Sequence, residues 1–250
     1  MIRDHVHEAD SWFAAALGAP GPADGAHRAH ATREAGHIAA SLGDWARARR
    51  LLEESLSFAI AAESEVDIAH ALVSLGREEE GLRKLEELGD DRRIASGLHR
   101  LGHRALIDGD RERAQGFFAR AVELYRRSES PTELANSVHS LGDSGLRAGD
   151  LAEAGRCYRE SLEIFSRLGS TNGVAYCLGG IATIAARRGD LAVAARLWRA
   201  MEAAEERVGF RLLNLERDYY EEAVAPALGR SPVAPPAEAA AVREALSYVD

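Results

Sequence analysis

A 40-residue period organises most of this chain. Four segments, residues 25–64, 91–130, 131–170 and 171–210, align on one another without a gap. Each has Gly-Asp at the same place, an alanine four residues after the aspartate and a bulky residue one turn later: Gly43-Asp44, Gly109-Asp110, Gly149-Asp150 and Gly189-Asp190; Ala48, Ala114, Ala154 and Ala194; Leu52, Phe118, Tyr158 and Trp198. A fixed period of about 20 to 50 residues is typical of solenoids, whose units stack because none can bury its apolar face alone.

Each unit has the pattern of two helices joined by a turn. In residues 131–170 small or apolar residues recur every three or four positions in both halves: Leu134, Val138, Leu141 and Gly145, then Leu151, Ala154, Tyr158, Leu162 and Phe165. This spacing places them on one stripe of a helix. Between the halves, Gly149 can adopt the left-handed conformation that ends a helix, and Asp150 can cap the next one. The sequence therefore predicts an all-α array of helix hairpins.

The pattern Leu141-Gly142, Gly149-Asp150, Ala154, Tyr158, Ser161-Leu162 resembles the 40-residue form of the tetratricopeptide repeat. That form is found in the C-terminal regions of LuxR-type (MalT-like) and AfsR-like bacterial regulators, and the tail from Arg196 to Gly229 is similar to their last stretch. The resemblance implies a tetratricopeptide-type solenoid, a right-handed superhelix, that binds other proteins in transcriptional regulation. The nucleotide-binding and DNA-binding domains that such regulators normally carry are not recognisable in this sequence.

The pattern divides the chain into three parts. Residues 1–24 read as the second helix of a partial first repeat, residues 25–210 as the solenoid, and residues 211–250 as a C-terminal cap and tail. Terminal units with a polar outer face are what a stacked array requires at its ends. Within the tail, residues 229–237 are a Pro-rich linker between two short helices.

Residues 65–90 form a shortened unit that lacks the 14 central residues, including the Gly-Asp turn. Two structures remain open: a short hairpin that turns near Gly76 to Gly81, or one continuous helix through both glycines. Two glycines inside a helix cost about 1 kcal/mol each. We therefore favour the short hairpin.

Composition excludes several classes of protein. With 46% hydrophobic residues among 250, the chain can bury an ample core, yet it has no apolar run of membrane-spanning length and no signal segment. The formal net charge of -9, with acids and arginines interspersed, argues against direct nucleic-acid binding. We therefore expect a cytoplasmic protein without membrane or nucleic-acid contact. Cys157 and Cys177 are too few for a disulfide framework and are expected to pack as small apolar residues.

Motifs of catalysis are missing from the sequence. Its single lysine, Lys84, lies in no glycine-rich phosphate loop. Ser144, in the sequence LGDSG, falls inside a predicted helix rather than on the strand-to-helix turn of a nucleophile elbow. We expect a protein that is not an enzyme and has no cofactor.

The strongest candidate for a binding surface is a stripe of polar side chains opposite the core stripe of each first helix. We number the places of each unit from its first residue, which is residue 25, 65, 91, 131 or 171. The stripe occupies places 6, 9, 13 and 17. Six of the nine histidines lie on it. By the resemblance, first helices line the concave groove, so a protein or peptide partner, or a small anionic ligand held by the arginines, would contact this stripe. The candidate residues are His30, Arg33, His37, His70, Arg77, His99, His103, Asn136, His139, Asp143, Arg147, Tyr176, Thr183 and Arg187.

Histidines that share one wall repel each other when protonated. Those near Arg33 and Arg77 should therefore titrate below about 6.5, and an anionic ligand should bind more tightly as the pH falls from about 7.5 to 6. His99, His103 and His139 have a spacing that a metal could use, but no further ligand besides Asp143 completes the set, so we expect no metal.

Three alternative interpretations remain open. The polar stripe can be an inert solvated face, the groove can be a sensor for a small molecule or peptide, and the array can be a structural assembly adaptor. The segment containing Trp12, Phe13 and Leu17 has no preceding helix, which predicts self-association through this N-terminal edge.

Overall fold

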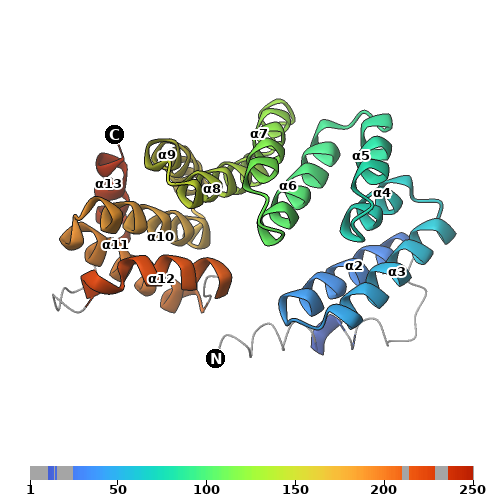
Figure 1. The fold of residues 1–250 in the computed structure, drawn as a ribbon, viewed down its shortest axis with the longest axis horizontal. Coiled ribbons are helices and arrows are strands. Elements are labelled where there is room, and N and C mark those ends of the chain that lie inside the picture. The colour runs from blue at the N-terminus through green and yellow to red at the C-terminus, as the bar shows by residue number, and fades with distance from the viewer. Residues whose placement is uncertain (1–10, 14, 16–24, 210–213, 229–235, 250) are drawn as a thin grey trace. The chain divides into compact units, whose positions relative to one another are not determined.

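All regular structure in the described part of the chain is α-helical. The computed structural model describes residues 11–13, 15, 25–209, 214–228 and 236–249. Consecutive helices pair as antiparallel hairpins, so the all-α helix-hairpin architecture is confirmed (Figure 1). The chain divides into two compact units, residues 1–101 and 102–250, and the division falls inside helix α6 (Asp91–Ile107).

The first unit contains two hairpins and the beginning of α6. Helices α2 (Gly25–Ser41) and α3 (Trp45–Ala61) form the first hairpin, and α4 (Glu65–Ser74) and α5 (Glu78–Glu87) form the second. Gly76, with φ of 81°, turns the chain between α4 and α5. A Cβ atom at Gly81 would lie 2.8 Å from the carbonyl oxygen of Ala69, so this glycine allows α4 and α5 to approach closely. Residues 65–90 thus form a hairpin of two short helices.

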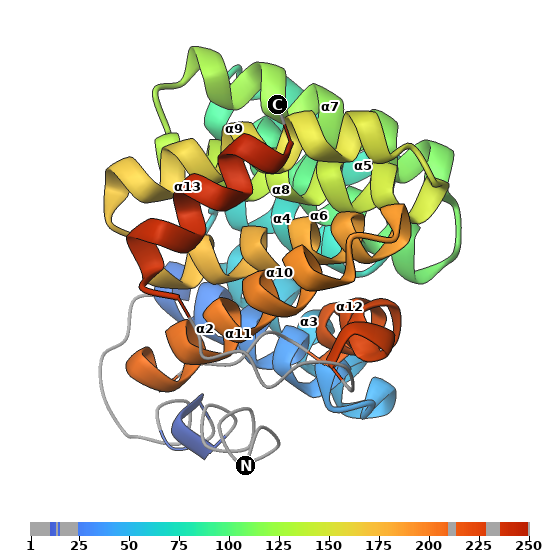
Figure 2. The same ribbon diagram turned by 90° about the vertical axis from the view of Figure 1, so that its left-hand side faces the viewer.

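The second unit continues the array and ends in two further helices. After α6 come α7 (Arg111–Arg127), α8 (Pro131–Ala148), α9 (Leu151–Leu168), α10 (Thr171–Arg188) and α11 (Leu191–Val208). Helix α12 (Asn214–Leu228) packs on α10 and α11, and α13 (Glu238–Tyr248) contacts α9, α10 and α11 (Figure 2). These are the predicted capping helices. Most of the linker predicted between them lies outside the described residues.

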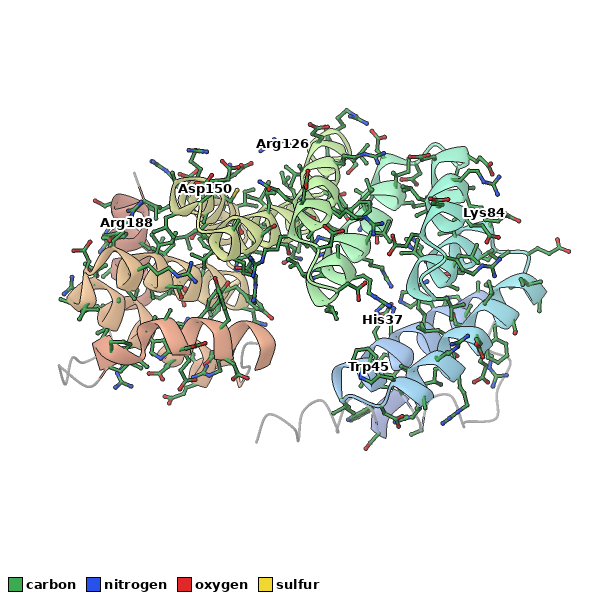
Figure 3. All side chains as sticks on the ribbon, in the orientation of Figure 1. His37, Trp45, Lys84, Arg126, Asp150 and Arg188 are labelled. Carbon is green, nitrogen blue, oxygen red and sulfur yellow. The ribbon has the colours of Figure 1, made fainter. Side chains whose placement is uncertain are left out.

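All four Gly-Asp pairs turn the chain as the sequence predicts, and in three of them the aspartate also caps the next helix; the side chain of Asp190 accepts a hydrogen bond from the Tyr248 hydroxyl instead. Gly43, Gly109, Gly149 and Gly189 all have φ between 81° and 87°. The side chains of Asp44, Asp110 and Asp150 then accept the amide of the third residue of the following helix, at 2.9 to 3.1 Å (Asp150 is labelled in Figure 3). One dipeptide therefore both ends the first helix and caps the second.

Only a fragment of the predicted N-terminal partial repeat can be compared with the structure. Of residues 1–24 only 11–13 and 15 are described, and Leu17 lies outside them. The Trp12 side chain is 71% exposed. Self-association through this edge stays a prediction.

A small residue facing a large one sets the distance between the two helices of a hairpin. At place 12 the first helix carries glycine, and at place 28 the second carries Leu52, Phe118 or Tyr158. A Cβ atom at Gly36 would lie 3.0 Å from Leu52, and one at Gly142 would lie 3.1 Å from Tyr158. At Gly102 it would lie 2.5 Å from the ring of Phe118, which is fully buried. The large side chain therefore lies directly on the backbone of the facing helix.

This packing predicts opposite effects for two Gly→Ala substitutions in neighbouring helices. Gly102→Ala should lower the free energy of unfolding by about 1 to 3 kcal/mol, because the new methyl group forces the Phe118 ring to move. Gly116→Ala, on the exposed face of α7 where a Cβ atom meets nothing within 4 Å, should raise it by about 0.5 to 1 kcal/mol through helix propensity. Urea denaturation monitored by circular dichroism measures both changes. A Gly102→Ala protein as stable as the wild type would disprove the close contact.

Candidate partner-binding site

The predicted site residues fall into three groups by accessibility. His30, Arg77, Asn136 and Arg187 are exposed; His37, His99, His103, Arg147 and Tyr176 are half-buried; Arg33, His70, His139, Asp143 and Thr183 are buried. The expectation of a fully solvated stripe is therefore wrong for the last group. The physical reason is packing: first helices of adjacent hairpins contact each other, α2 with α4 and α8 with α10, and α12 covers α10.

In the first unit Arg33 is the centre of a polar network. Its guanidinium group is almost completely buried, with 3% of the side chain exposed. It donates to Nδ1 of His30 at 2.7 Å, to Glu34 on the next position at 3.3 Å, and to Asp67 of α4 at 3.4 Å. A buried guanidinium group needs such partners, because an unpaired buried charge is strongly destabilising.

Arg100 extends the network to a third helix. From α6 its guanidinium group donates to Glu34 and to Nε2 of His37, each at 3.3 Å. The hydroxyl of Ser74 lies 3.0 Å from Nε2 of His37 and 3.0 Å from the main-chain carbonyl oxygen of His70, and its single proton can be donated to one of these two acceptors at a time. Side chains from α2, α4 and α6 are thus joined in one continuous set of hydrogen bonds. We call this set, with the stripe residues Arg77 and His99, the unit-1 wall.

Burial and neighbouring cations fix the charges of this wall. Burial, followed by the charge of Arg100, lowers the pKa of His37 to about 4. The same two causes, with Arg33 adding to them, lower the pKa of His70 to about 3. Burial acts to raise the pKa of Glu34, but the surrounding cations, Arg100 first, outweigh it and lower that pKa. Near neutral pH both histidines are uncharged and the glutamate is ionised.

These pKa shifts confirm that His37 and His70 titrate below the ordinary value. They also mean that these two histidines cannot make anion binding tighter as the pH falls from 7.5 to 6. Burial is the larger cause of both shifts, and neither residue changes charge over that range.

Four members of the wall were missed from the sequence: Glu34, Asp67, Ser74 and Arg100. Except for Asp67, they occupy place 10 of their units, one position beside the predicted stripe. The repeated contact of place 13 with place 10 of the next unit explains their role. His37 meets Ser74 in this way, and in the second unit Nε2 of His103 lies 3.4 Å from the hydroxyl of Ser140. A polar residue recurring at place 10 was the available signal.

In the second unit part of the predicted stripe is covered by other side chains of the protein. Asp143 of α8 is buried and accepts hydrogen bonds from the hydroxyls of Tyr158 and of Tyr220, which comes from the capping helix α12. Burial, together with the charge of Asp143, raises the pKa of Tyr158 well above its ordinary value, so the phenol remains a donor. Nδ1 of His139 lies 3.7 Å from Asp143, and its ring packs against Tyr158 and Tyr176.

Thr183 and Gly179 of α10 complete this covered region. The Thr183 hydroxyl donates to the carbonyl of Gly179 at 2.9 Å, within its own helix. A Cβ atom at Gly179 would lie 3.0 Å from the Tyr220 ring. Helix α12 therefore covers the stripe at Asp143 and Thr183 and touches Arg147 and Arg187 through Tyr219, while Asn136 and Arg187 remain exposed.

Metal-ligand grouping, thiol reactivity and membrane-spanning length can each be checked in the described residues. Among them no three His, Cys, Asp or Glu side chains are grouped as metal ligands would be. Burial raises the pKa values of the Cys157 and Cys177 thiols to about 12, so neither is a reactive thiolate. No helix in the described ranges is long and apolar enough to span a membrane.

Comparison with known proteins identifies the class of repeat. Residues 133–200 match the tetratricopeptide-repeat family. A Rap protein solved in complex with Competence and Sporulation Factor is 13% identical, with 83% of this chain and 66% of the Rap chain covered and a TM-score of 0.51. A putative kinesin light chain from Podosopora anserina with nearly identical repeats is 15% identical, with 74% and 97% covered and a TM-score of 0.51. No curated protein sequence matches.

The chain therefore contains a tetratricopeptide-repeat region. At these identities the solved structures establish the helix-hairpin fold, and this chain spans slightly less than two thirds of the Rap protein that it matches.

The low pKa values of His37 and His70 predict that the folded protein loses stability in acid. Between about pH 3 or 4 and 6.5 the unfolded chain binds more protons at these positions than the folded chain, so stability must fall as the pH falls. At about 1.4 kcal/mol per pH unit, each histidine costs about 2 kcal/mol between pH 6.5 and 5. In the His37→Gln/His70→Gln variant this loss should shrink, as measured by urea denaturation at several pH values. His27→Gln, at an exposed position, is the control. An unchanged pH dependence in the double variant would contradict the assignment.

Proposed function

We propose that this protein is a non-catalytic interaction module whose unit-1 wall holds a segment of a partner protein or peptide. The observation that carries the proposal is the network in which Arg33 and Arg100 share Glu34 across α2 and α6. Three helices supply its members, so the donors are held in place before a partner arrives. Preorganised groups lose little conformational entropy on binding.

Energetics supports a role in recognition rather than in folding. Desolvating two guanidinium groups and their carboxylates costs free energy, and well-packed apolar residues are often as stabilising or more so. Around Tyr158 and Trp198 the array is held mainly by apolar contacts, to which a hydrogen bond from the Tyr158 hydroxyl to Asp143 and one from Nε1 of Trp198 to Glu202 are added. A polar wall with exposed His30 and Arg77 at its margins instead suits hydrogen bonding to the backbone and polar side chains of an extended segment.

The second unit supports the same assignment by contrast. Tyr220 and α12 cover its stripe at Asp143 and Thr183, so a partner cannot reach the stripe there, whereas the unit-1 wall keeps His30 and Arg77 exposed. Capping of this kind solubilises the end of an array and removes that surface from partner binding.

Two likenesses support a regulatory setting. The Rap protein of similar fold was solved with Competence and Sporulation Factor bound to it. The repeat pattern and the tail from Arg196 to Gly229 resemble the C-terminal regions of LuxR-type and AfsR-like regulators. We place the protein, on this basis, in cytoplasmic signalling or transcriptional regulation through its partner, with self-association through the Trp12 edge as an additional contact.

Site-specific crosslinking tests the proposal. A photo-crosslinking residue placed at His30 or Arg77 should capture a partner from native lysate, whereas the same residue at Arg50, exposed on α3, should not. The charge reversal Arg100→Glu should lower capture at His30 by about tenfold or more, since charge-assisted hydrogen bonds are lost. Arg93→Glu, an exposed reversal on the same helix, is the matched control.

Equal capture at Arg50 and at the two wall positions would contradict the proposal. Capture at His30 that survives Arg100→Glu in a protein of unchanged helicity would do so as well.

A further inference from the structure

Two arginines of the second unit converge on one tyrosine ring. Arg147 ends α8 and Arg187 ends α10, and both occupy place 17 of their units. The guanidinium carbon of Arg147 lies 4.0 Å from the centre of the Tyr219 ring, and that of Arg187 lies 5.3 Å from it. Tyr219 comes from α12, so this arrangement exists only because the capping helix crosses the ends of two first helices.

Neutral groups alone hold these two cations in place. Arg187 donates to the carbonyl of Leu146 at 2.7 Å and to the Tyr219 hydroxyl at 2.6 Å, and that hydroxyl donates to the same carbonyl at 3.2 Å. Among the described residues no carboxylate lies within ion-pair distance of Arg147 or Arg187. Three other arginines of the same region do have such partners: Arg196 binds Glu244, Arg199 binds Glu202, and Arg217 binds Glu205.

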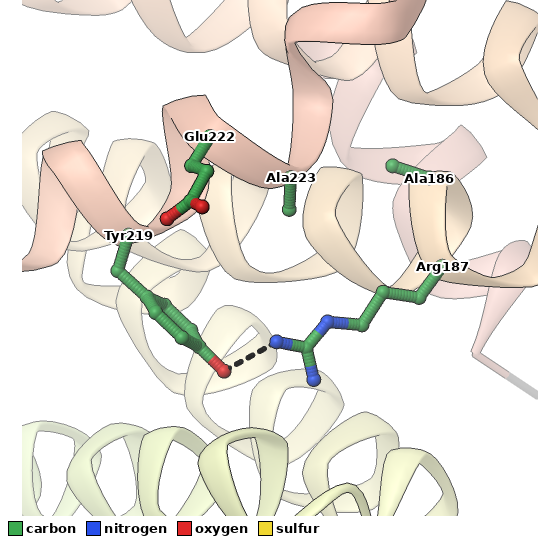
Figure 4. Close-up of a pocket in the computed structure, with 5 residues that line it drawn as sticks. All are labelled: Ala186, Arg187, Tyr219, Glu222 and Ala223. Carbon is green, nitrogen blue, oxygen red and sulfur yellow. Dashed lines mark hydrogen bonds between the residues drawn. The ribbon is translucent and has the colours of Figure 1, made fainter.

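A pocket of about 390 Å³ opens beside this pair. It is lined by Tyr219, Glu222 and Ala223 of α12 on one side and by Ala186 and Arg187 of α10 on the other, and Arg187 reaches across to the Tyr219 hydroxyl (Figure 4). The volume lies within the range of small-molecule sites. The pocket therefore presents one guanidinium group, the methyl groups of two alanines and one carboxylate acceptor.

We propose that this pocket binds an α-carboxylate that carries a neighbouring N–H group, as at the C-terminus of a peptide or in a free amino acid. The carboxylate would bind to the remaining N–H groups of Arg187, next to the Tyr219 ring on which Arg147 stacks, and the amine or amide N–H would donate to Glu222. A ligand of this chemistry supplies the carboxylate that the arginine pair lacks. The site stands on residues of the second unit and does not depend on the unit-1 wall.

Titration with acetyl-alanyl-alanine tests this site directly. The Nε–H resonances of the arginines in the full-length protein should shift and saturate, with a dissociation constant on the order of 1 mM, as expected for so small a ligand. The C-terminal amide of the same dipeptide has no carboxylate and should give no saturable shift. Free alanine is the second arm: tighter binding than the dipeptide identifies an amino-acid site, and weaker binding identifies a peptide terminus.

Paired variants locate the binding. Arg187→Gln should weaken binding by about tenfold or more, because it removes charge-assisted hydrogen bonds. Arg188→Gln should leave it unchanged, since Arg188 is the adjacent exposed arginine and faces the Tyr248 ring instead. Equal shifts with the carboxylate and the amide would overturn the proposal, as would an equal loss of binding in the two variants. Circular dichroism checks that both variants retain their helices.

Discussion

The contact between a small residue at place 12 and a large one at place 28 is the constraint on which the array depends. With glycine at Gly36, Gly102 and Gly142, the bulky side chain of the second helix rests on the backbone of the first. In the fourth full unit Ala182 and Trp198 occupy these places, and both are fully buried. Interiors packed this closely transmit small changes of volume. The hairpin geometry, and with it the direction of every stripe, follows from this pair.

Because each hairpin is narrow, first helices of successive hairpins come into contact. Their facing side chains at places 10 and 13 must then be compatible, and in both compact units the solution is a histidine against a serine: His37 with Ser74, and His103 with Ser140. The same proximity allows Arg100 to reach Glu34 across 66 positions of sequence. The polar wall is thus a consequence of helix spacing, and we infer that partner recognition uses it.

The sequence predicts the repeated architecture well because each signal is local and occurs four times. The Gly-Asp turns and the bulky residues at place 28 can both be read without knowledge of tertiary contacts. Accessibility of the stripe could not be read in this way. Whether Thr183 or Asp143 meets water depends on Tyr220, which lies far along the chain in a helix whose register the repeat does not fix.

The place-10 residues were missed for a related reason. The repeat period identifies the residues opposite the core of a single helix. It does not show which residues contact the first helix of the neighbouring unit, and the place-10 residues make that contact. The buried Arg33 shows the difference: its partners Glu34 and Asp67 lie beside the predicted stripe and make its burial tolerable.

The central claim is that the stripe is divided: Tyr220 and α12 cover it at Asp143 and Thr183, whereas His30 and Arg77 reach solvent at the margin of the unit-1 wall. Reaction of histidines with diethylpyrocarbonate at neutral pH, read out by mass spectrometry, tests it most directly. His30, which is exposed, should react much faster than His139, which is 6% exposed and must await local opening. His70, at 7% exposed, should be as slow as His139. If His139 reacts as fast as His30 in the folded protein, the account of a stripe divided into covered and accessible parts is wrong.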